Sequence, residues 1–114
     1  MTLKKVQARF YLAATGANPV RDWLVKLAPE DRKQMGHDIG VVEYGWPIGM
    51  PVCKAMGDGL WEVRSTLARR RIARVLFCFS GGELILLHAF IKKTQKTPPE
   101  ELALARKRMK EIER

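Results

Sequence analysis

The chain has 114 residues, of which 46% are hydrophobic, and a formal net charge of +9. This length and composition predict a single folded domain over residues 1–114 and exclude a disordered tail. The sequence has no apolar run of the ~18 residues that a membrane span requires, and from its first residues we expect no secretory leader. Its two cysteines lack metal or disulfide spacing, so we expect a cytoplasmic protein without membrane, metal or small-molecule cofactor.

The first half of the chain predicts one strand followed by two helices. Residues 3–14 are compatible with a strand. A helix is predicted to start at Asn18–Pro19, since proline is tolerated at the first helical position. A second is predicted from Pro29, where acidic residues in the first turn favour the helix dipole. Apolar residues at helical spacing predict one buried stripe on each helix: Val20, Trp23, Leu24 and Leu27 on the first, then Met35, Ile39 and Val42 on the second.

The second half predicts three strands and a closing helix. The segment GLWEVRSTL alternates between two faces, and RIARVLFCF reads as an apolar strand that follows a basic turn. Gly81–Gly82 predicts a tight hairpin before ELILLHAFI. The order β-α-α-β-β-β-α indicates an α+β fold, with a small antiparallel sheet packed against the N-terminal helical hairpin. The C-terminal helix, predicted after the double proline at 98–99, has an inner stripe of Leu102, Ala105, Met109 and Ile112.

Positive charge is concentrated in residues 64–96, where eight cations face one anion, Glu83. This segment therefore carries +7 of the net charge of +9. Such a concentration is typical of proteins that bind a polyanion. Nucleic acid is the first candidate, and an anionic membrane or an acidic protein are the alternatives. The eight cations are Arg64, Arg69, Arg70, Arg71, Arg74, Lys92, Lys93 and Lys96.

Two of these cations, Arg64 and Arg74, stand within predicted strands among apolar residues. A buried arginine is costly without a partner. The structural interpretation is therefore a salt bridge to Glu62 or Glu83, and the functional one is phosphate binding. The arginines at 69–71 lie in a turn, where we expect a solvated rim that contacts RNA phosphates.

The last predicted strand ends in a run of cationic and hydrogen-bonding side chains. Lys92, Lys93 and Lys96 are predicted to emerge beside the strand arginines. With Thr94 and Gln95, they form a candidate phosphate-binding element. A double proline then ends the run and starts the closing helix.

Only one of the two adjacent lysines can line such a site, because neighbours on an extended chain point to opposite faces. Simple alternation predicts Lys92 rather than Lys93, since it places Lys92 on one face with Leu86, His88 and Phe90.

The remaining titratable groups give weaker candidates. His37 and His88 could form a paired-histidine ribonuclease, but they lie on different predicted elements. His88, within an apolar strand, more simply forms a hydrogen bond at the edge of the core. Asp58 and Glu62 could be paired carboxylates, although their positions indicate a turn and an exposed strand.

A cationic surface could cleave RNA as well as bind it. The 2′-hydroxyl of RNA is a nucleophile beside the phosphate, so the enzyme must move two protons and stabilise the phosphorane charge. Arginine suits the phosphorane, because its fork binds phosphate oxygens in two places. A lysine can transfer protons when neighbouring cations and partial burial lower its pKa.

The segment Gly59–Met109 resembles the phage-derived branch of the RelE/HigB-like toxins within the ParE/RelE superfamily. The resemblance rests on LWEVR, RIARVLF and above all LLHAFIKKTQKTPPEE. It implies a small sheet with an N-terminal helical hairpin and a ribosome-dependent endoribonuclease that cuts mRNA. It also implies a cognate antitoxin, commonly a helix-turn-helix protein.

By this resemblance, Arg64 matches the conserved strand arginine of the family, Arg74 matches a recurrent arginine, and Lys92 or Lys93 matches a second phosphate-binding cation. Many relatives use a tyrosine near the C-terminus, whereas the tyrosines of this chain are Tyr11 and Tyr44. The resemblance therefore leaves the general acid and base unassigned. A non-catalytic nucleic-acid- or protein-binding module and a gyrase-directed toxin of the same fold are the alternatives.

Overall fold

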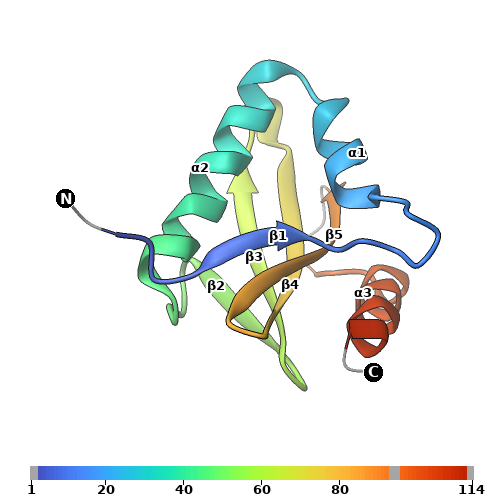
Figure 1. Ribbon diagram of the computed structural model, residues 1–114. Coiled ribbons are helices and arrows are strands. Elements are labelled where there is room, and N and C mark those ends of the chain that lie inside the picture. The colour runs from blue at the N-terminus through green and yellow to red at the C-terminus, as the bar shows by residue number, and fades with distance from the viewer. Residues whose placement is uncertain (1–2, 93–95, 113–114) are drawn as a thin grey trace.

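The computed structural model describes residues 3–92 and 96–112 of the chain. This part contains three α-helices and a five-stranded sheet (Figure 1), which confirms the predicted α+β class. The elements are β1 (Gln7–Phe10), α1 (Pro19–Val25), α2 (Pro29–Gly45), β2 (Cys53–Gly57), β3 (Leu60–Thr66), a 3-10 turn (Ala68–Arg70), β4 (Ile72–Ser80), β5 (Glu83–Lys92) and α3 (Pro99–Ile112).

The strand order across the sheet is β1-β5-β4-β3-β2. Strands β2 to β5 form an antiparallel meander, whereas β1 pairs in parallel with β5. On the other side of β1, Glu43 at the end of α2 receives backbone hydrogen bonds. Its side-chain Oε2 accepts from the amide of Ala8 at 2.8 Å, and its carbonyl accepts from the amides of Lys5 and Val6. Glu43 thus satisfies edge donors that would otherwise be available for pairing with another chain.

Two details of the predicted strand order are wrong. The order omitted β2, and the strand predicted over residues 3–14 is limited to Gln7–Phe10. In β2 only Cys53 is buried, so this edge strand carries no alternating hydrophobic pattern that a sequence could reveal. The pairing of the first strand was not predicted: β1 lies at the edge of the sheet opposite β2 and runs parallel to β5.

Each face of the sheet has its own hydrophobic core. The core under α1 and α2 includes Val20, Met35 and Val42, and the core under α3 includes Ala105 and Met109. The buried stripes predicted for the helices are therefore confirmed. Figure 1 shows α2 and α3 on opposite sides of the sheet. The α3 face matters most for the site, because Arg64 and Arg74 share it.

A β-bulge in β5 changes which side chains share a face. Leu76 of β4 pairs with His88, but the next residue, Phe77, pairs with Leu86, so Leu87 is an additional residue in β5. Leu86 consequently packs in the core under α1 and α2, whereas Phe90 packs in the core under α3. The expectation that Leu86 shares a face with His88 and Phe90 is wrong for this reason.

Candidate functional site

The site is centred on two arginines that the sheet register places side by side. Arg64 of β3 pairs directly with Arg74 of β4, and Arg74 pairs with Phe90 of β5. Phe90 belongs to the core under α3, so both arginines lie on that face of the sheet. The Arg64 side chain is 39% exposed, whereas Arg74 is completely buried. A ligand can therefore contact Arg64 directly, whereas Arg74 lies beneath the surface.

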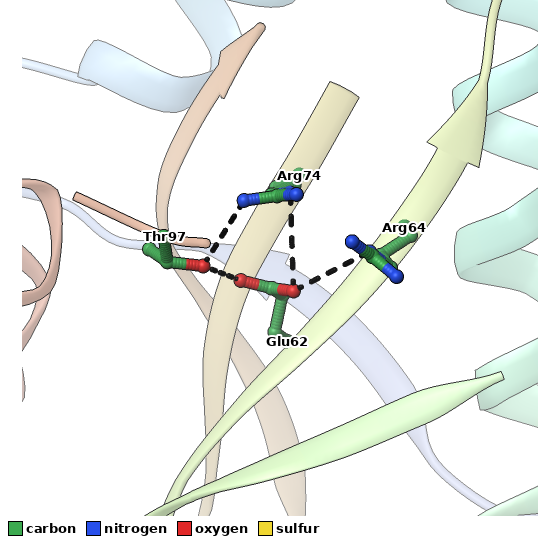
Figure 2. A network of polar contacts seen from close by, with 4 residues as sticks. All are labelled: Glu62, Arg64, Arg74 and Thr97. Carbon is green, nitrogen blue, oxygen red and sulfur yellow. Dashed lines mark hydrogen bonds and ion pairs between the residues drawn. The ribbon is translucent and has the colours of Figure 1, made fainter. Parts of the chain in front are cut away.

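A buried carboxylate lies between the two guanidinium groups (Figure 2). Oε1 of Glu62 is 3.8 Å from Nε of Arg64 and 4.0 Å from Nε of Arg74. Thr97, just before α3, donates its hydroxyl to Oε2 of Glu62 and accepts a hydrogen bond from Nη1 of Arg74 at 3.4 Å. The four side chains thus form one polar network that joins β3, β4 and the segment leading into α3.

Burial controls the electrostatics of this network. It lowers the pKa of Arg74; Glu62 opposes that shift, and the positive charge of Arg64 adds to it. Glu62 itself is only 2% exposed. A carboxylate is seldom buried to this degree without a cationic partner. The network therefore carries two positive charges and one negative charge, with the excess positive charge beside solvent at Arg64.

The salt-bridge interpretation of the strand arginines is confirmed with Glu62 as the partner. Glu83, the alternative partner, instead accepts a hydrogen bond from Nε of Arg9 in β1 at 3.2 Å. The expectation that Glu62 lies on an exposed strand is wrong. Alternation placed it on the same face as Arg64, but could not show that Thr97 folds back over that face.

The predicted lysines are only partly described. The backbone of Lys92 pairs with that of Ile72, which is two residues from Arg74 on β4. Lys96 is exposed and directly precedes Thr97. Lys93, Thr94 and Gln95 lie outside the described residues. The catalytic roles predicted for Lys92, Lys93 and Lys96, and the RNA-binding roles predicted for Thr94 and Gln95, stay predictions.

The three arginines of the basic turn differ from one another. Arg69 and Arg70 are exposed and have positive φ angles of 61° and 60°. Arg71 instead makes two bonds to Asp31 of α2, from Nη1 to Oδ2 at 2.9 Å and from Nη2 to Oδ1 at 3.1 Å. Arg69 and Arg70 thus suit a phosphate-contacting rim, whereas Arg71 ties the turn to α2.

The histidines do not form a pair. His37 is exposed on α2, on the far side of the sheet from α3. His88 stacks on Phe90, with ring centroids 5.5 Å apart, and its Nε2 contacts Oε2 of Glu101 in α3. This agrees with a histidine that makes a hydrogen bond at the edge of the core.

Sequence reasoning missed Thr97 as a member of the site. Its signal was weak, because a threonine before two prolines is an ordinary way to begin a helix.

Among residues 3–92 and 96–112, no three or more histidine, cysteine or acidic side chains gather where they could hold a metal ion. In the same ranges, no helix is long and apolar enough to cross a membrane.

A protein-family comparison matches residues 22–110 to the family described as "Phage derived protein Gp49-like (DUF891)". The matched range contains Glu62, Arg64, Arg74 and Thr97, so the whole network lies inside it. A comparison with curated proteins finds no match.

Proposed function

The chain belongs to the phage-derived Gp49-like family, and from this premise we propose that it is the toxin of a type II toxin–antitoxin pair. Its activity would be ribosome-dependent cleavage of mRNA, which inhibits translation. Its partners would be the ribosome, mRNA and a cognate antitoxin, commonly a helix-turn-helix protein.

The observation that carries this proposal is the pairing of a half-exposed arginine with a buried one. Arg64 is accessible to a phosphate, and Arg74 adds positive potential from the adjacent strand. A guanidinium fork held by a carboxylate is preorganised for an oxyanion, so little reorganisation is needed when phosphorane charge develops. The +7 charge of residues 64–96 would steer the RNA backbone toward this point.

In the proposed reaction, the 2′-hydroxyl of the RNA gives its proton to a base and attacks the adjacent phosphate. The 5′-oxygen leaves with a proton from an acid, which yields a 2′,3′-cyclic phosphate end and a 5′-hydroxyl end. Arg64 would stabilise the charge on the phosphorane, and Arg74 would raise the local positive potential. Lys92, Lys93 and Lys96 are proposed to bind phosphate or transfer protons, as the KKTQK motif suggests. The scheme assigns the phosphorane charge to Arg64 and proton transfer to the lysines, so it includes no step on a metal ion.

The test is primer extension on ribosome-bound mRNA with purified wild-type protein and Arg64→Ala. Removing one preorganised donor at a developing charge typically lowers the rate about a hundredfold or more. Arg9→Ala is the matched control, because Arg9 is similarly exposed, at 44%, and pairs with a carboxylate away from the site. Circular dichroism verifies folding. Wild-type cleavage by folded Arg64→Ala would contradict the assignment of Arg64.

A non-catalytic RNA-binding module of the same fold is the second candidate. It is favoured by the complete burial of Arg74, which can attract RNA through its charge but cannot touch it. The same assay separates the two, because a binding module associates with ribosomes without producing cleavage ends. A gyrase-directed toxin would instead inhibit DNA supercoiling and leave mRNA intact.

A further inference from the structure

We propose that Glu62 is a positioning residue that fixes the orientation of the Arg64 guanidinium, and that it does so at a cost in RNA affinity. This inference rests on the proposed function for its effect on cleavage. Its effects on side-chain orientation and on binding can be measured without cleavage.

The geometry gives Glu62 this role. Its Oε1 faces the Nε atoms of both Arg64 and Arg74, at 3.8 and 4.0 Å, and its Oε2 receives the hydroxyl of Thr97. Both oxygens are therefore engaged, and the carboxylate is only 2% exposed. Because the ion pair is made through Nε, it restricts rotation of the Arg64 side chain about its last bonds.

The charge of Glu62 has the opposite effect on binding. A carboxylate beside two guanidinium groups repels an incoming phosphate and cancels part of their attraction. Glu62 is thus expected to weaken RNA binding slightly and to accelerate cleavage, the step in which the orientation of the Arg64 guanidinium matters.

The decisive variant is Glu62→Gln, which keeps the shape of the side chain and removes its charge. RNA affinity, measured at fixed salt with a short single-stranded oligonucleotide, should rise about two- to threefold. Cleavage of ribosome-bound mRNA at saturating protein should fall about tenfold or more, because small misplacements of a catalytic group cost this much. A simple loss of structure would lower both quantities, so opposite changes are the signature of positioning.

Glu83→Gln is the matched control. Glu83 also pairs with an arginine, Arg9, but its side chain is 43% exposed and lies away from the network. It should leave cleavage unchanged and raise RNA affinity by less than Glu62→Gln does.

Removing the charge of Glu62 also leaves buried Arg74 less compensated, so the glutamine variant can fail to fold. Glu62→Asp then serves instead, since it keeps the negative charge but withdraws the carboxylate by one methylene. It should fold, bind RNA with unchanged affinity and cleave more slowly. Wild-type cleavage by folded Glu62→Asp would overturn the proposal.

A measurement independent of cleavage separates this inference from the proposed function. The order parameter of the Arg64 Nε–H, from ¹⁵N relaxation, should fall in whichever Glu62 variant folds and stay unchanged in Glu83→Gln. If the wild type never cleaves but the order parameter falls, Glu62 positions Arg64 in a binding site and only the ribonuclease proposal falls. If the order parameter does not change, the positioning role is overturned whether or not the protein cleaves.

Discussion

The bond between Arg71 and Asp31 gives a sharp test of how the basic turn is held. These residues are 40 positions apart, and two hydrogen bonds of 2.9 and 3.1 Å join them. The Asp31 side chain is 7% exposed and that of Arg71 is 32% exposed. Asp31→Asn would keep the volume of the side chain, remove its charge and place an amide donor against a guanidinium donor.

The expected loss in the free energy of unfolding is about 2 kcal/mol. Hydrogen bonds to charged groups contribute roughly 1.5–3 kcal/mol each, but part of this is recovered here because asparagine keeps one acceptor and the exposed side of Arg71 can turn to water. For a domain of this size, 2 kcal/mol corresponds to a decrease in Tm of about 8 °C. Thermal and denaturant unfolding, followed by circular dichroism, would measure both quantities.

Asp22→Asn is the control for this experiment. Asp22 also pairs with an arginine, Arg21, but at 3.9 Å and with both side chains about 60% exposed. Its substitution should change stability by no more than about 0.5 kcal/mol. Equal losses in Asp31→Asn and Asp22→Asn would refute the reasoning. So would strict additivity of Asp31→Asn with Arg71→Gln, because residues in direct contact should show coupling.

Three further predictions follow from the backbone and the buried titratable groups. Arg70 has a φ of 60°, which glycine adopts without strain, so Arg70→Gly should keep or raise Tm; a lower Tm would contradict this. The same substitution should make the log–log salt dependence of single-stranded RNA binding shallower by about 0.7, because one phosphate contact is lost. The hydrogen bond from Tyr11 to Glu111, together with burial, raises the pKa of Tyr11. The contribution of this raised pKa to the free energy of unfolding should therefore be complete below about pH 10 and be lost as the pH rises further. Denaturant unfolding at several pH values would measure this loss, and the Tyr11→Phe variant should not show it. Burial raises the pKa of Cys53 to about 11, so a thiol reagent at pH 8 should modify Cys53 only after unfolding; rapid reaction of the native protein would contradict its burial.

Most of the fold could be predicted because its signals are local. The helical spacing of apolar residues predicted the buried faces of α2 and α3, and the alternation of side chains predicted β3. The family match confirms the phage-derived part of the resemblance and leaves the specific RelE/HigB type as a proposal. Strand β2 and the parallel pairing of β1 could not be predicted, because both depend on contacts between distant segments and not on a local pattern.

The site was predictable to the extent that it lies within single strands. Arg64 and Arg74 stood out because arginines among apolar residues require an explanation, and Glu62 could be named as a partner because it is two residues from Arg64 on the same strand face. Its burial could not be foreseen. The bond between Arg71 and Asp31 was equally hidden, since Asp31 reads as an ordinary acid in the first turn of a helix.

Thr97 joins the two parts of the site that the sequence presented separately. It stands at the end of the lysine-rich run, yet its hydroxyl belongs to the network of the strand arginines. Immediately after it, the carbonyl of Pro98 accepts the amides of Glu101 and Leu102 and begins α3. At the start of the run, Lys92 pairs with Ile72 of β4, and at its end Thr97 accepts a hydrogen bond from Arg74 of the same strand. The described residues at the two ends of this run, Lys92 and Thr97, are therefore both held by contacts to β4, the strand that carries the buried Arg74.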